Sequence, residues 1–367
     1  MNRGKRCWIT IILHEIEIQE NLLKSVVLTG IREILIKEVP VPEIENSTDI
    51  LLKTLAVGVC GSDIHYYKKG RIGDQVVVYP FIVGHECVAV VEKVGSDVSR
   101  VKPGEIVVVD PAISCGECSQ CLMGREHTCL NQKFLGSPGQ TEGCLSEFLV
   151  IPEKNCYPVP YEMSIEQSTL VEPLSIGYYT LQFLKDRKID SIGILGVGPI
   201  GLSVLLAANI RGVQKIFVTD ILDYRLKIAQ EQGTFWLGNP EKIDVVESIR
   251  SKCPDLLDVV IECCGKQEAL DQAIEILKPG GMLLIVGIPE VDRISFNISK
   301  IRRKEITIQN VRRQNQCIQP VIALVKNKRW LPDFMVTHQF YFTESKKVFD
   351  LVADYQDGVM KALIRFD

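Results

Sequence analysis

The sequence predicts a two-domain α/β protein, in which a β-rich, partly open barrel is joined to a doubly wound parallel sheet of six strands. Between residues 25 and 151, short expected strands alternate with Gly/Pro turns, a pattern typical of small barrels. From residue 191, apolar strands alternate with helical runs, as in a parallel sheet with crossover helices. A chain of 367 residues is long enough for two such domains.

Residues 1–24 precede both patterns. They begin with basic residues and a short apolar run, which superficially resembles a signal peptide. His14, Glu15 and Glu17 follow at once, without a small-residue cleavage site. We therefore expect an N-terminal extension with a weak strand and no chemistry of its own.

The composition favours a globular protein of a reducing compartment, and we expect it in the cytoplasm. Hydrophobic residues make up 46% and charged residues 24%. A net charge of −4 without a basic block gives no reason to expect a nucleic-acid partner. No run reaches the roughly 18 apolar residues of a membrane helix. The 13 cysteines are odd in number and partly clustered, which argues against a secreted disulfide scaffold.

The first domain is expected to open with strands at residues 25–28 and 32–38, followed by a strand at 49–57. Glycines at positions 58, 61 and 70 predict a loop that carries Cys60 to Tyr67. Strands rich in apolar and β-branched residues are expected at 87–93, 106–110 and 148–151.

The loop and the segment after it bring together candidate metal ligands. Cys60, His85 and Glu86 offer a thiolate, an imidazole and a carboxylate, a donor set typical of a catalytic Zn²⁺ with an open position. Asp63 is placed to orient a ligand from behind. The alternative is a buried thiol and a core histidine without a metal, and each residue taken alone favours that alternative.

Three further residues are candidates for proton transfer. Ser62 and His65 supply the hydroxyl and imidazole of a proton relay. Glu172 precedes a proline where a helix can begin. Its carboxylate either interacts with that helix N-terminus or reaches the catalytic zinc, and the sequence favours neither.

A second metal site is predicted by four clustered cysteines. The spacing of Cys115, Cys118, Cys121 and Cys129 suits one tetrahedral Zn²⁺. The alternatives are free thiols or disulfides. Because all four donors are sulfur, no position remains for water, and this zinc is expected to be structural.

The second domain is expected to bind a dinucleotide. A strand at 191–195 runs into Gly-x-Gly-x-x-Gly and then a helix, so that backbone N–H groups face the pyrophosphate. Asp220 ends the next strand and would accept hydrogen bonds from the adenosine ribose, which favours NAD over NADP. The expected cofactor-binding residues are Gly196, Gly198, Pro199, Ile200, Gly201, Asp220, Arg225, Val286, Gly287 and Ile288.

The α/β alternation continues to residue 309. Helices are expected at 222–232 and 267–277, and strands at 257–262, 281–287 and 306–309. A further helix is expected at 317–327. Residues 331–367 mix strand and helix patterns, and we expect them to return to the first domain.

Together these motifs resemble the zinc-containing medium-chain dehydrogenase/reductase (alcohol dehydrogenase) family, and within it the sorbitol or polyol dehydrogenases. The resemblance rests on residues 60–67, 70–73, 84–86, 172–175, 196–201 and 218–220 and on the four-cysteine cluster. It implies a GroES-like catalytic domain from residues 25–172 and 310–367, with the zinc lobe at 115–129. It also implies a Rossmann NAD-binding domain from residues 173–309.

The resemblance further implies a function. Cys60, His85 and Glu86 would bind the catalytic zinc, with water or Glu172 completing its shell, and Tyr66 and Arg313 would lie near the substrate. Gln314 stands where animal polyol dehydrogenases carry tyrosine, and many of those also lack the four cysteines. Arg312 and Arg313 either favour an anionic substrate such as a sugar acid or are a surface basic pair.

We therefore expect an NAD-dependent enzyme with two zinc ions per chain that oxidises a secondary alcohol of a polyol. The metal would lower the pKa of the hydroxyl before hydride transfer. The alternatives are a threonine or butanediol dehydrogenase, which shares the motifs, and a non-catalytic NAD-binding or sensor protein. The expected partner is a small alcohol, and the resemblance suggests a homodimer or homotetramer.

Overall fold

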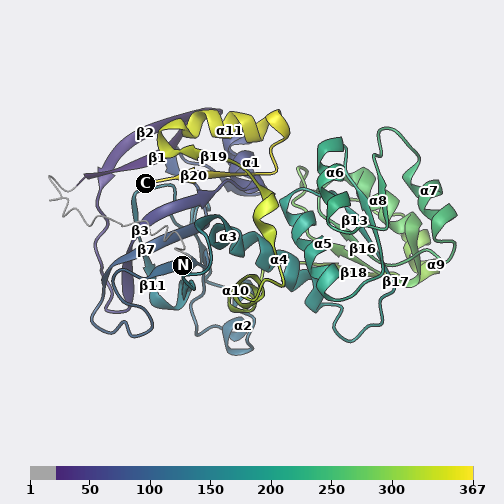
Figure 1. The fold of residues 1–367 in the computed structure, drawn as a ribbon, viewed down its shortest axis with the longest axis horizontal. Helices are drawn as coiled ribbons and strands as arrows, with labels where there is room; N and C mark the ends of the chain where they lie inside the picture. Colours follow the sequence, from purple (N-terminus) through teal and green to yellow (C-terminus); the bar gives the residue numbers. More distant parts are fainter. Residues whose placement is uncertain (1–21, 367) are drawn as a thin grey trace, which may run out of the picture.

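A computed structural model describes residues 22–366 as two lobes joined side by side, one rich in strands and one with a central parallel sheet (Figure 1). The weak strand expected near the N-terminus lies outside the described residues. Residues 22–24 of the expected extension already belong to the first strand. None of the described helices is long and apolar enough to cross a membrane.

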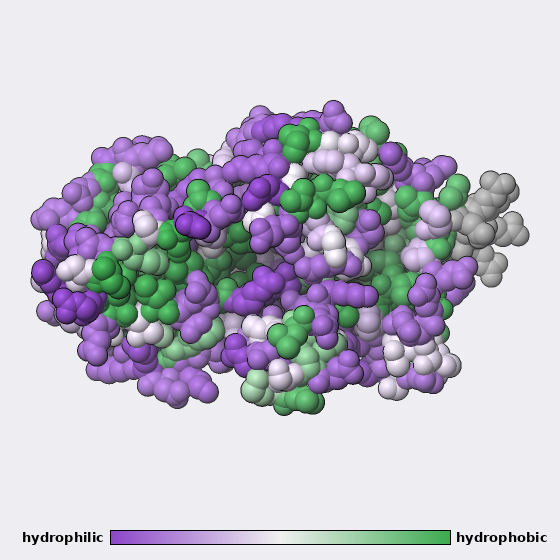
Figure 2. All heavy atoms as spheres, turned by 180° about the vertical axis from the view of Figure 1, so that it is seen from behind, coloured by the Kyte–Doolittle hydropathy of each residue, from purple (hydrophilic) through white to green (hydrophobic). Residues whose placement is uncertain are grey.

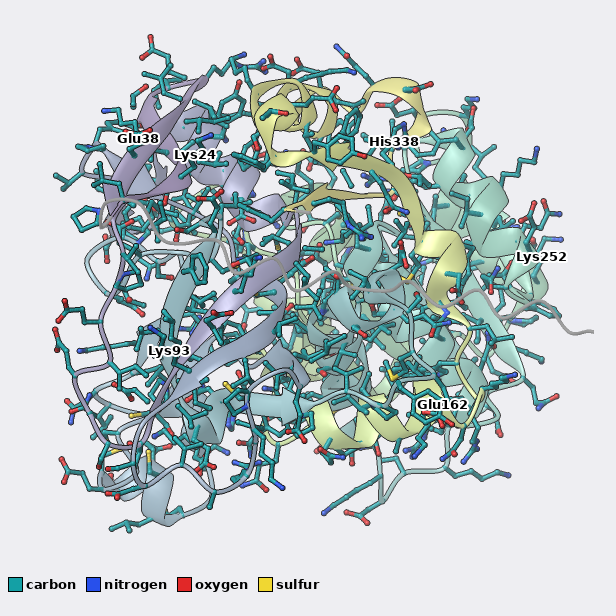
Figure 3. All side chains as sticks on the ribbon, turned by 60° about the vertical axis from the view of Figure 1, so that its left-hand side comes forward. Lys24, Glu38, Lys93, Glu162, Lys252 and His338 are labelled. Atoms are coloured by element: carbon teal, nitrogen blue, oxygen red, sulfur yellow. The ribbon has the colours of Figure 1, made fainter. Side chains whose placement is uncertain are left out.

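The strand-rich lobe combines the N-terminal part of the described chain with its C-terminal segment. Strands β1 (Leu22–Gly30) and β2 (Glu33–Pro40) form an antiparallel hairpin, in which Lys24 lies opposite Glu38 (Figure 3). Strand β6 (Phe81–Ile82) adds to β1. The larger sheet has the order β12-β8-β7-β3-β20-β19, with β11 also paired to β3. Its strands are β3 (Asp49–Gly58), β7 (Glu86–Val94), β8 (Ile106–Val109), β11 (Phe148–Pro152), β12 (Cys156–Pro158), β19 (Val336–Tyr341) and β20 (Lys361–Arg365).

The return of the C-terminal segment is visible in the strand pairing. Strand β20 pairs antiparallel with β3, which places Leu363 opposite Gly58. The helices of this lobe are α1 (Gly61–Lys69), α2 (Ser119–Leu122), α3 (Ile165–Thr169) and α11 (Ser345–Ala353). Short strand pairs are β4 (Arg71–Ile72) with β5 (Gln75–Val76) and β9 (Ala112–Ile113) with β10 (Lys133–Phe134). Short 3₁₀ turns are η1 (Glu126–Thr128), η2 (Glu153–Asn155), η3 (Pro332–Met335), η4 (Phe342–Glu344) and η5 (Gln356–Gly358).

The prediction of a loop at residues 60–67 was wrong, because this segment forms helix α1 and its N-cap residue Cys60. The Asp63 carboxylate accepts a hydrogen bond from the Cys60 N–H, and Gly70 ends the helix in a left-handed conformation at φ 66°. Two of the glycines taken as loop signals therefore flank or begin a helix. The consequence is that the predicted relay residues lie on a rigid element.

The second lobe is a six-stranded, all-parallel sheet in the order β15-β14-β13-β16-β17-β18. This is the order of a doubly wound dinucleotide-binding sheet. Its strands are β13 (Ser191–Leu195), β14 (Lys215–Thr219), β15 (Trp236–Gly238), β16 (Leu257–Glu262), β17 (Leu277–Ile285) and β18 (Thr307–Asn310). The prediction of six strands is confirmed, although it did not locate β15.

Helices cover both faces of this sheet. One apolar cluster includes residues of α4 (Val171–Gln182), α5 (Pro199–Ile210), α6 (Asp223–Glu231) and α10 (Ile318–Lys326). Another includes residues of α7 (Val245–Lys252), α8 (Gln267–Ile276) and α9 (Ile298–Lys304). Figure 2 shows a recess with apolar residues where the two lobes meet.

Candidate active site

The predicted catalytic metal ligands lie together at the start of two elements. Cys60 is the N-cap of α1, while His85 immediately precedes β7 and Glu86 begins it. One potential ligand atom from each of the three lies within 4.8 Å of those of the other two. A thiol, an imidazole and a carboxylate at this spacing fit a zinc ion, which accepts sulfur, nitrogen and oxygen donors.

Asp63 supports two of these ligands from behind. Its carboxylate accepts hydrogen bonds from the Cys60 N–H at 3.0 Å and the Gly84 N–H at 3.2 Å, and one oxygen lies 3.4 Å from His85 Nδ1. Burial lowers the pKa of His85, but Asp63 and Cys60 outweigh burial, so that the pKa lies well above its usual range. This contact leaves the other ring nitrogen of His85 for a metal.

Lys361 is a site residue that sequence reasoning missed. Its Nζ lies 2.7 Å from each carboxylate oxygen of Glu86, and both side chains are buried. Nζ also donates to the Val59 carbonyl at 3.2 Å. No local pattern links a lysine near the C-terminus to Glu86, because β20 brings it there through its pairing with β3.

Glu172 lies in the first turn of α4 and is buried. Burial raises the pKa of its carboxyl to about 7, and the nearby charges of His85, Glu86 and Lys361 also act on it. Among the described residues, no side chain or backbone group is hydrogen-bonded to this carboxyl. Glu172 therefore lies close enough to the metal cluster for its charges to act on the carboxyl, although it is not within the 4.8 Å group formed by Cys60, His85 and Glu86.

The predicted relay residues are on α1 but are not joined. Ser62 and His65 are both half-buried, and neither makes a side-chain hydrogen bond to another described residue. Burial lowers the pKa of His65, and Glu290 of the other lobe opposes that effect. The predicted substrate residue Tyr66 is buried and donates from its hydroxyl to Gln75 Oε1 at 3.1 Å.

Arg313 links the parallel sheet to the metal cluster. Its guanidinium carbon lies 3.4 Å from the ring centroid of Phe134, and that ring lies 5.3 Å from the His85 ring. Arg313 Nη1 also donates to Gln132 Oε1 at 2.7 Å. Arg313 follows β18, so the carboxyl edge of the sheet is one aromatic ring away from a predicted zinc ligand.

Gln314 forms hydrogen bonds that hold the segment after β18 in place. Its amide donates to Asp110 Oδ2 at 2.8 Å and accepts from the Cys317 N–H at 2.8 Å, and the residue is buried. Burial raises the pKa of Asp110 to about 6. Gln314 thus ties the segment after β18 to the end of β8.

The four predicted cysteines of the second metal site converge. Their Sγ atoms lie 3.5 Å apart for Cys118–Cys121 and Cys115–Cys129, 3.9 Å for Cys118–Cys129 and 4.0 Å for Cys115–Cys121. Four sulfurs around a zinc with bonds of about 2.3 Å are expected about 3.8 Å apart. All four are free of disulfides. The Cys121 and Leu130 N–H groups lower the pKa of Cys118 to about 6, which favours its thiolate.

The glycine-rich turn has the geometry required of a dinucleotide loop. Gly196 adopts φ +91°, and a Cβ there would lie 2.8 Å from the Cys264 Cβ. A Cβ on Gly201 would lie 2.1 Å from the Gly196 carbonyl oxygen. Gly198 is the N-cap of α5, with Pro199 and Ile200 in its first turn, so the helix N-terminus opens at this turn.

Asp220 and Arg225 lie beside this turn. The Asp220 carboxylate accepts hydrogen bonds from the Val197 N–H at 2.8 Å and the Leu222 N–H at 2.9 Å. Arg225 Nη1 lies 3.9 Å from Asp220, and its guanidinium carbon lies 5.0 Å from the ring centroid of Tyr355 in the other lobe. Asp220 therefore also fixes the backbone of the glycine loop.

Val286, Gly287 and Ile288 follow the carboxyl end of β17. The Val286 and Gly287 N–H groups donate to the Glu262 carbonyl at 2.9 and 3.0 Å, while Ile288 is exposed. The buried Glu262 side chain accepts from the Cys264 N–H at 2.7 Å, and a Cβ on Gly287 would lie 2.7 Å from its other oxygen. Sequence reasoning missed this role of Glu262, which shapes the carboxyl edge.

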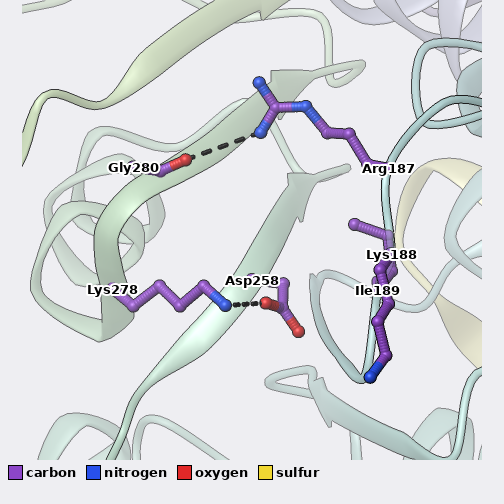
Figure 4. Close-up of a pocket in the computed structure, with 6 residues that line it drawn as sticks. All are labelled: Arg187, Lys188, Ile189, Asp258, Lys278 and Gly280. Atoms are coloured by element: carbon purple, nitrogen blue, oxygen red, sulfur yellow. Dashed lines mark hydrogen bonds and ion pairs between the residues drawn. The ribbon is translucent and has the colours of Figure 1, made fainter.

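A shallow pocket of about 220 Å³ lies at the opposite, amino-terminal edge of the sheet (Figure 4). Asp258 at its base accepts from the Asp190 and Ser191 N–H groups at 2.9 Å and pairs with Lys278. Ligands of doubly wound sheets bind at the carboxyl edge, and Asp258 is already bonded. This pocket is therefore not the candidate active site.

Comparisons with known proteins agree with this architecture. Residues 46–161 match the family model described as alcohol dehydrogenase GroES-like domain, and residues 199–327 match the one described as zinc-binding dehydrogenase. The predicted GroES-like and Rossmann folds are thereby confirmed. The exact domain bounds stay a prediction.

Curated relatives and solved structures extend over nearly the whole chain. A sorbitol dehydrogenase of Bacillus subtilis is 33% identical over 343 residues, covering 93% of this chain and 97% of the relative. An L-idonate 5-dehydrogenase of Vitis vinifera is 30% identical over 322 residues, covering 86% and 87%. The crystal structure of an Escherichia coli oxidoreductase/dehydrogenase of unknown specificity has a TM-score of 0.88 at 29% identity, covering 94% and 99%. The chain belongs to the zinc-containing medium-chain dehydrogenase/reductase family and is sorbitol/polyol dehydrogenase-like.

Proposed function

We propose that this protein oxidises a secondary alcohol of a polyol or sugar acid with NAD, using one catalytic and one structural zinc ion. The single observation that carries this function is the contact chain from Arg313 through Phe134 to His85, which brings the carboxyl edge of the dinucleotide-binding sheet to the metal cluster. The names of the curated relatives support a polyol or sugar acid as the substrate class.

The residues around the proposed catalytic zinc have distinct tasks. Cys60 Sγ and the free ring nitrogen of His85 would hold the metal, because Asp63 occupies the other side of the imidazole. The charge of Glu86 is already matched by Lys361. We propose Glu172, whose carboxyl lacks a hydrogen-bond partner among residues 22–366, as the carboxylate that completes the shell directly or through water.

When bound, zinc would lower the pKa of the substrate hydroxyl and the nicotinamide would accept the hydride. Ser62 and His65 stand three positions apart on α1, so their side chains lie on the same face of the helix. We propose that the substrate hydroxyl gives its proton to Ser62 Oγ while Ser62 passes its own proton on toward His65 at the solvent side. Tyr66 and Arg313 would orient the substrate.

NAD is proposed over NADP because the Asp220 carboxylate lies at the end of β14, where a 2′-phosphate would meet its negative charge. The proposed cofactor contacts also include Arg225 and the backbone at residues 286–288. A cytoplasmic location is supported by the cysteines of residues 22–366, which form no disulfide. A homodimer or homotetramer is supported by β18, which is an edge strand of its sheet.

The function is tested by following NADH absorbance with sorbitol, xylitol, a sugar acid, threonine and 2,3-butanediol. Turnover with the polyols or the sugar acid is expected to exceed that with threonine and butanediol. A preference for threonine or butanediol would favour those dehydrogenases. NAD binding without turnover of any substrate by the zinc-loaded protein would favour a binding or sensor protein.

A further inference from the structure

Two adjacent arginines follow the carboxyl end of β18 without an acidic partner. Arg312 and Arg313 come directly after Val311, whose N–H donates to the Ile285 carbonyl of β17. Within residues 22–366, neither guanidinium forms an ion pair with a carboxylate. Both cations therefore lie next to the predicted nicotinamide-binding edge, and neither is paired with a negatively charged side chain of the described residues.

The contacts of Arg313 are all with neutral groups. Its guanidinium lies over the Phe134 ring and donates to the Gln132 amide oxygen. Burial and the neighbouring Arg312 lower the pKa of Arg313 to about 9. The charges of Glu172 and Asp110 oppose this effect, but neither carboxyl forms an ion pair with Arg313, so the repulsion between the two arginines is only partly offset.

Arg312 directly precedes Arg313 in the chain. The residue is exposed, and within the described chain it makes no hydrogen bond or ion pair. Tyr66, on helix α1 of the other lobe, is a neighbouring group that acts on its pKa. Arg312 is thus accessible from solvent and lies near the predicted substrate residue Tyr66.

We propose that Arg312 and Arg313 together bind an anionic group of the substrate, a carboxylate or a phosphate monoester, carried on the polyol a few carbon atoms from the oxidised hydroxyl. This inference rests on the proposed function and sharpens its substrate class. Guanidinium groups present paired donors that match the oxygens of carboxylates and phosphates. A neutral polyol would leave both cations uncompensated, whereas an anion would relieve their mutual repulsion.

The position of the metal cluster determines how far the anionic group of the substrate would lie from the hydroxyl that is oxidised. Phe134 neighbours both groups: its ring centroid lies 3.4 Å from the guanidinium carbon of Arg313 and 5.3 Å from the ring centroid of His85. A hydroxyl at the metal and an anion at the arginines would therefore be on different carbons of one extended molecule. Arg312 is in this account a specificity-determining residue that does not touch the reacting atoms.

The test compares kcat/KM with NAD for sorbitol, a hexonate (D-gluconate or L-idonate) and sorbitol 6-phosphate. Wild-type protein is expected to prefer at least one of the two anions to sorbitol by about tenfold or more, since hydrogen bonds between a guanidinium and an anion are stronger than those between neutral groups. Arg312→Gln should lower that preference about tenfold. The matched control is Arg303→Gln, an exposed arginine of α9, which should leave the ratio unchanged.

The two anionic substrates distinguish the carboxylate from the phosphate. A wild-type preference for sorbitol over both anions, or an anion-to-sorbitol ratio that Arg312→Gln does not change, would overturn the anion-binding inference while leaving the polyol dehydrogenase intact. Failure of all three substrates to reduce NAD would instead overturn the proposed function itself. Added NaCl should weaken the anion preference more in wild type than in Arg312→Gln.

Discussion

Lys361 and Glu86, separated by 275 positions in the sequence, form a fully buried ion pair in which Nζ lies 2.7 Å from both carboxylate oxygens. The pair joins β20 to the beginning of β7, where His85 and Glu86 stand. It therefore connects the C-terminal segment directly to the predicted catalytic metal ligands. Its energetic importance can be measured.

Replacing Lys361 by Met should leave Glu86 as an unpaired buried charge. We expect a loss of about 3–5 kcal/mol in the free energy of unfolding, measured by urea denaturation of the zinc-loaded protein. Lys347→Met is the matched control, because Lys347 pairs with Glu344 at the surface and its loss should cost below about 1 kcal/mol. Equal losses in the two variants would show that the buried pair has no special role.

The four-cysteine lobe should contribute to stability more than to chemistry. Cys118→Ala removes one of four converging thiolates and should release one zinc, lowering the thermal midpoint while leaving the KM for NAD close to wild type. Zinc content and thermal unfolding are measured on the same sample, with Ser119→Ala as the control from the same lobe. A stable Cys118→Ala protein without its second zinc would contradict a structural role.

Asp220 should set the cofactor preference. In Asp220→Ala, the negative charge beside the ribose position is lost, so kcat/KM for NADP relative to NAD should rise about tenfold or more. Because Asp220 also binds the Val197 N–H, the KM for NAD should rise as well. Asp186→Ala, an exposed acid in the same lobe, should change neither quantity. An unchanged cofactor ratio would place the ribose elsewhere.

Glu290 joins the two lobes through Lys69 of α1 and Lys266 near α8, with Nζ–Oε2 distances of 3.1 Å. These lysines lower the pKa of Glu290 to about 2. A depressed carboxyl pKa stabilises the folded state above the unfolded value near 4.5, and this stabilisation is lost as the pH falls through about 2.

The substitution Glu290→Gln should therefore cost below about 1 kcal/mol at pH 7, because the pair is exposed and screened. The deficit should shrink as the pH falls from 4.5 toward 2 and as salt is added. Urea unfolding at several pH values measures this. A deficit that grows on acidification would refute the assigned ion pairs.

Local patterns predicted most of the fold. The strand bounds 191–195 and 257–262 match β13 and β16, because continuous apolar runs between turns leave few alternatives. The helix α1 was missed because its capping carboxylate is Asp63, inside the first turn, rather than a conventional N-cap side chain. The strand β15 was missed because it has only three residues.

The site was predictable where ligands are close in sequence or belong to a motif. The metal triad and the four cysteines were recognised in this way, and the structure places each set together. Lys361 and Phe134 were not, since both reach the site through tertiary packing alone. The relay from Ser62 to His65 stays a prediction, as no hydrogen bond joins them.

The most direct test of the central claim is the zinc content of wild type and Cys60→Ser, measured by plasma mass spectrometry together with NADH formation from the preferred polyol or sugar acid. We predict two zinc ions per wild-type chain and one in Cys60→Ser, with turnover abolished and NAD binding retained. Two zinc ions and full turnover in Cys60→Ser would contradict a catalytic metal held by Cys60 and His85.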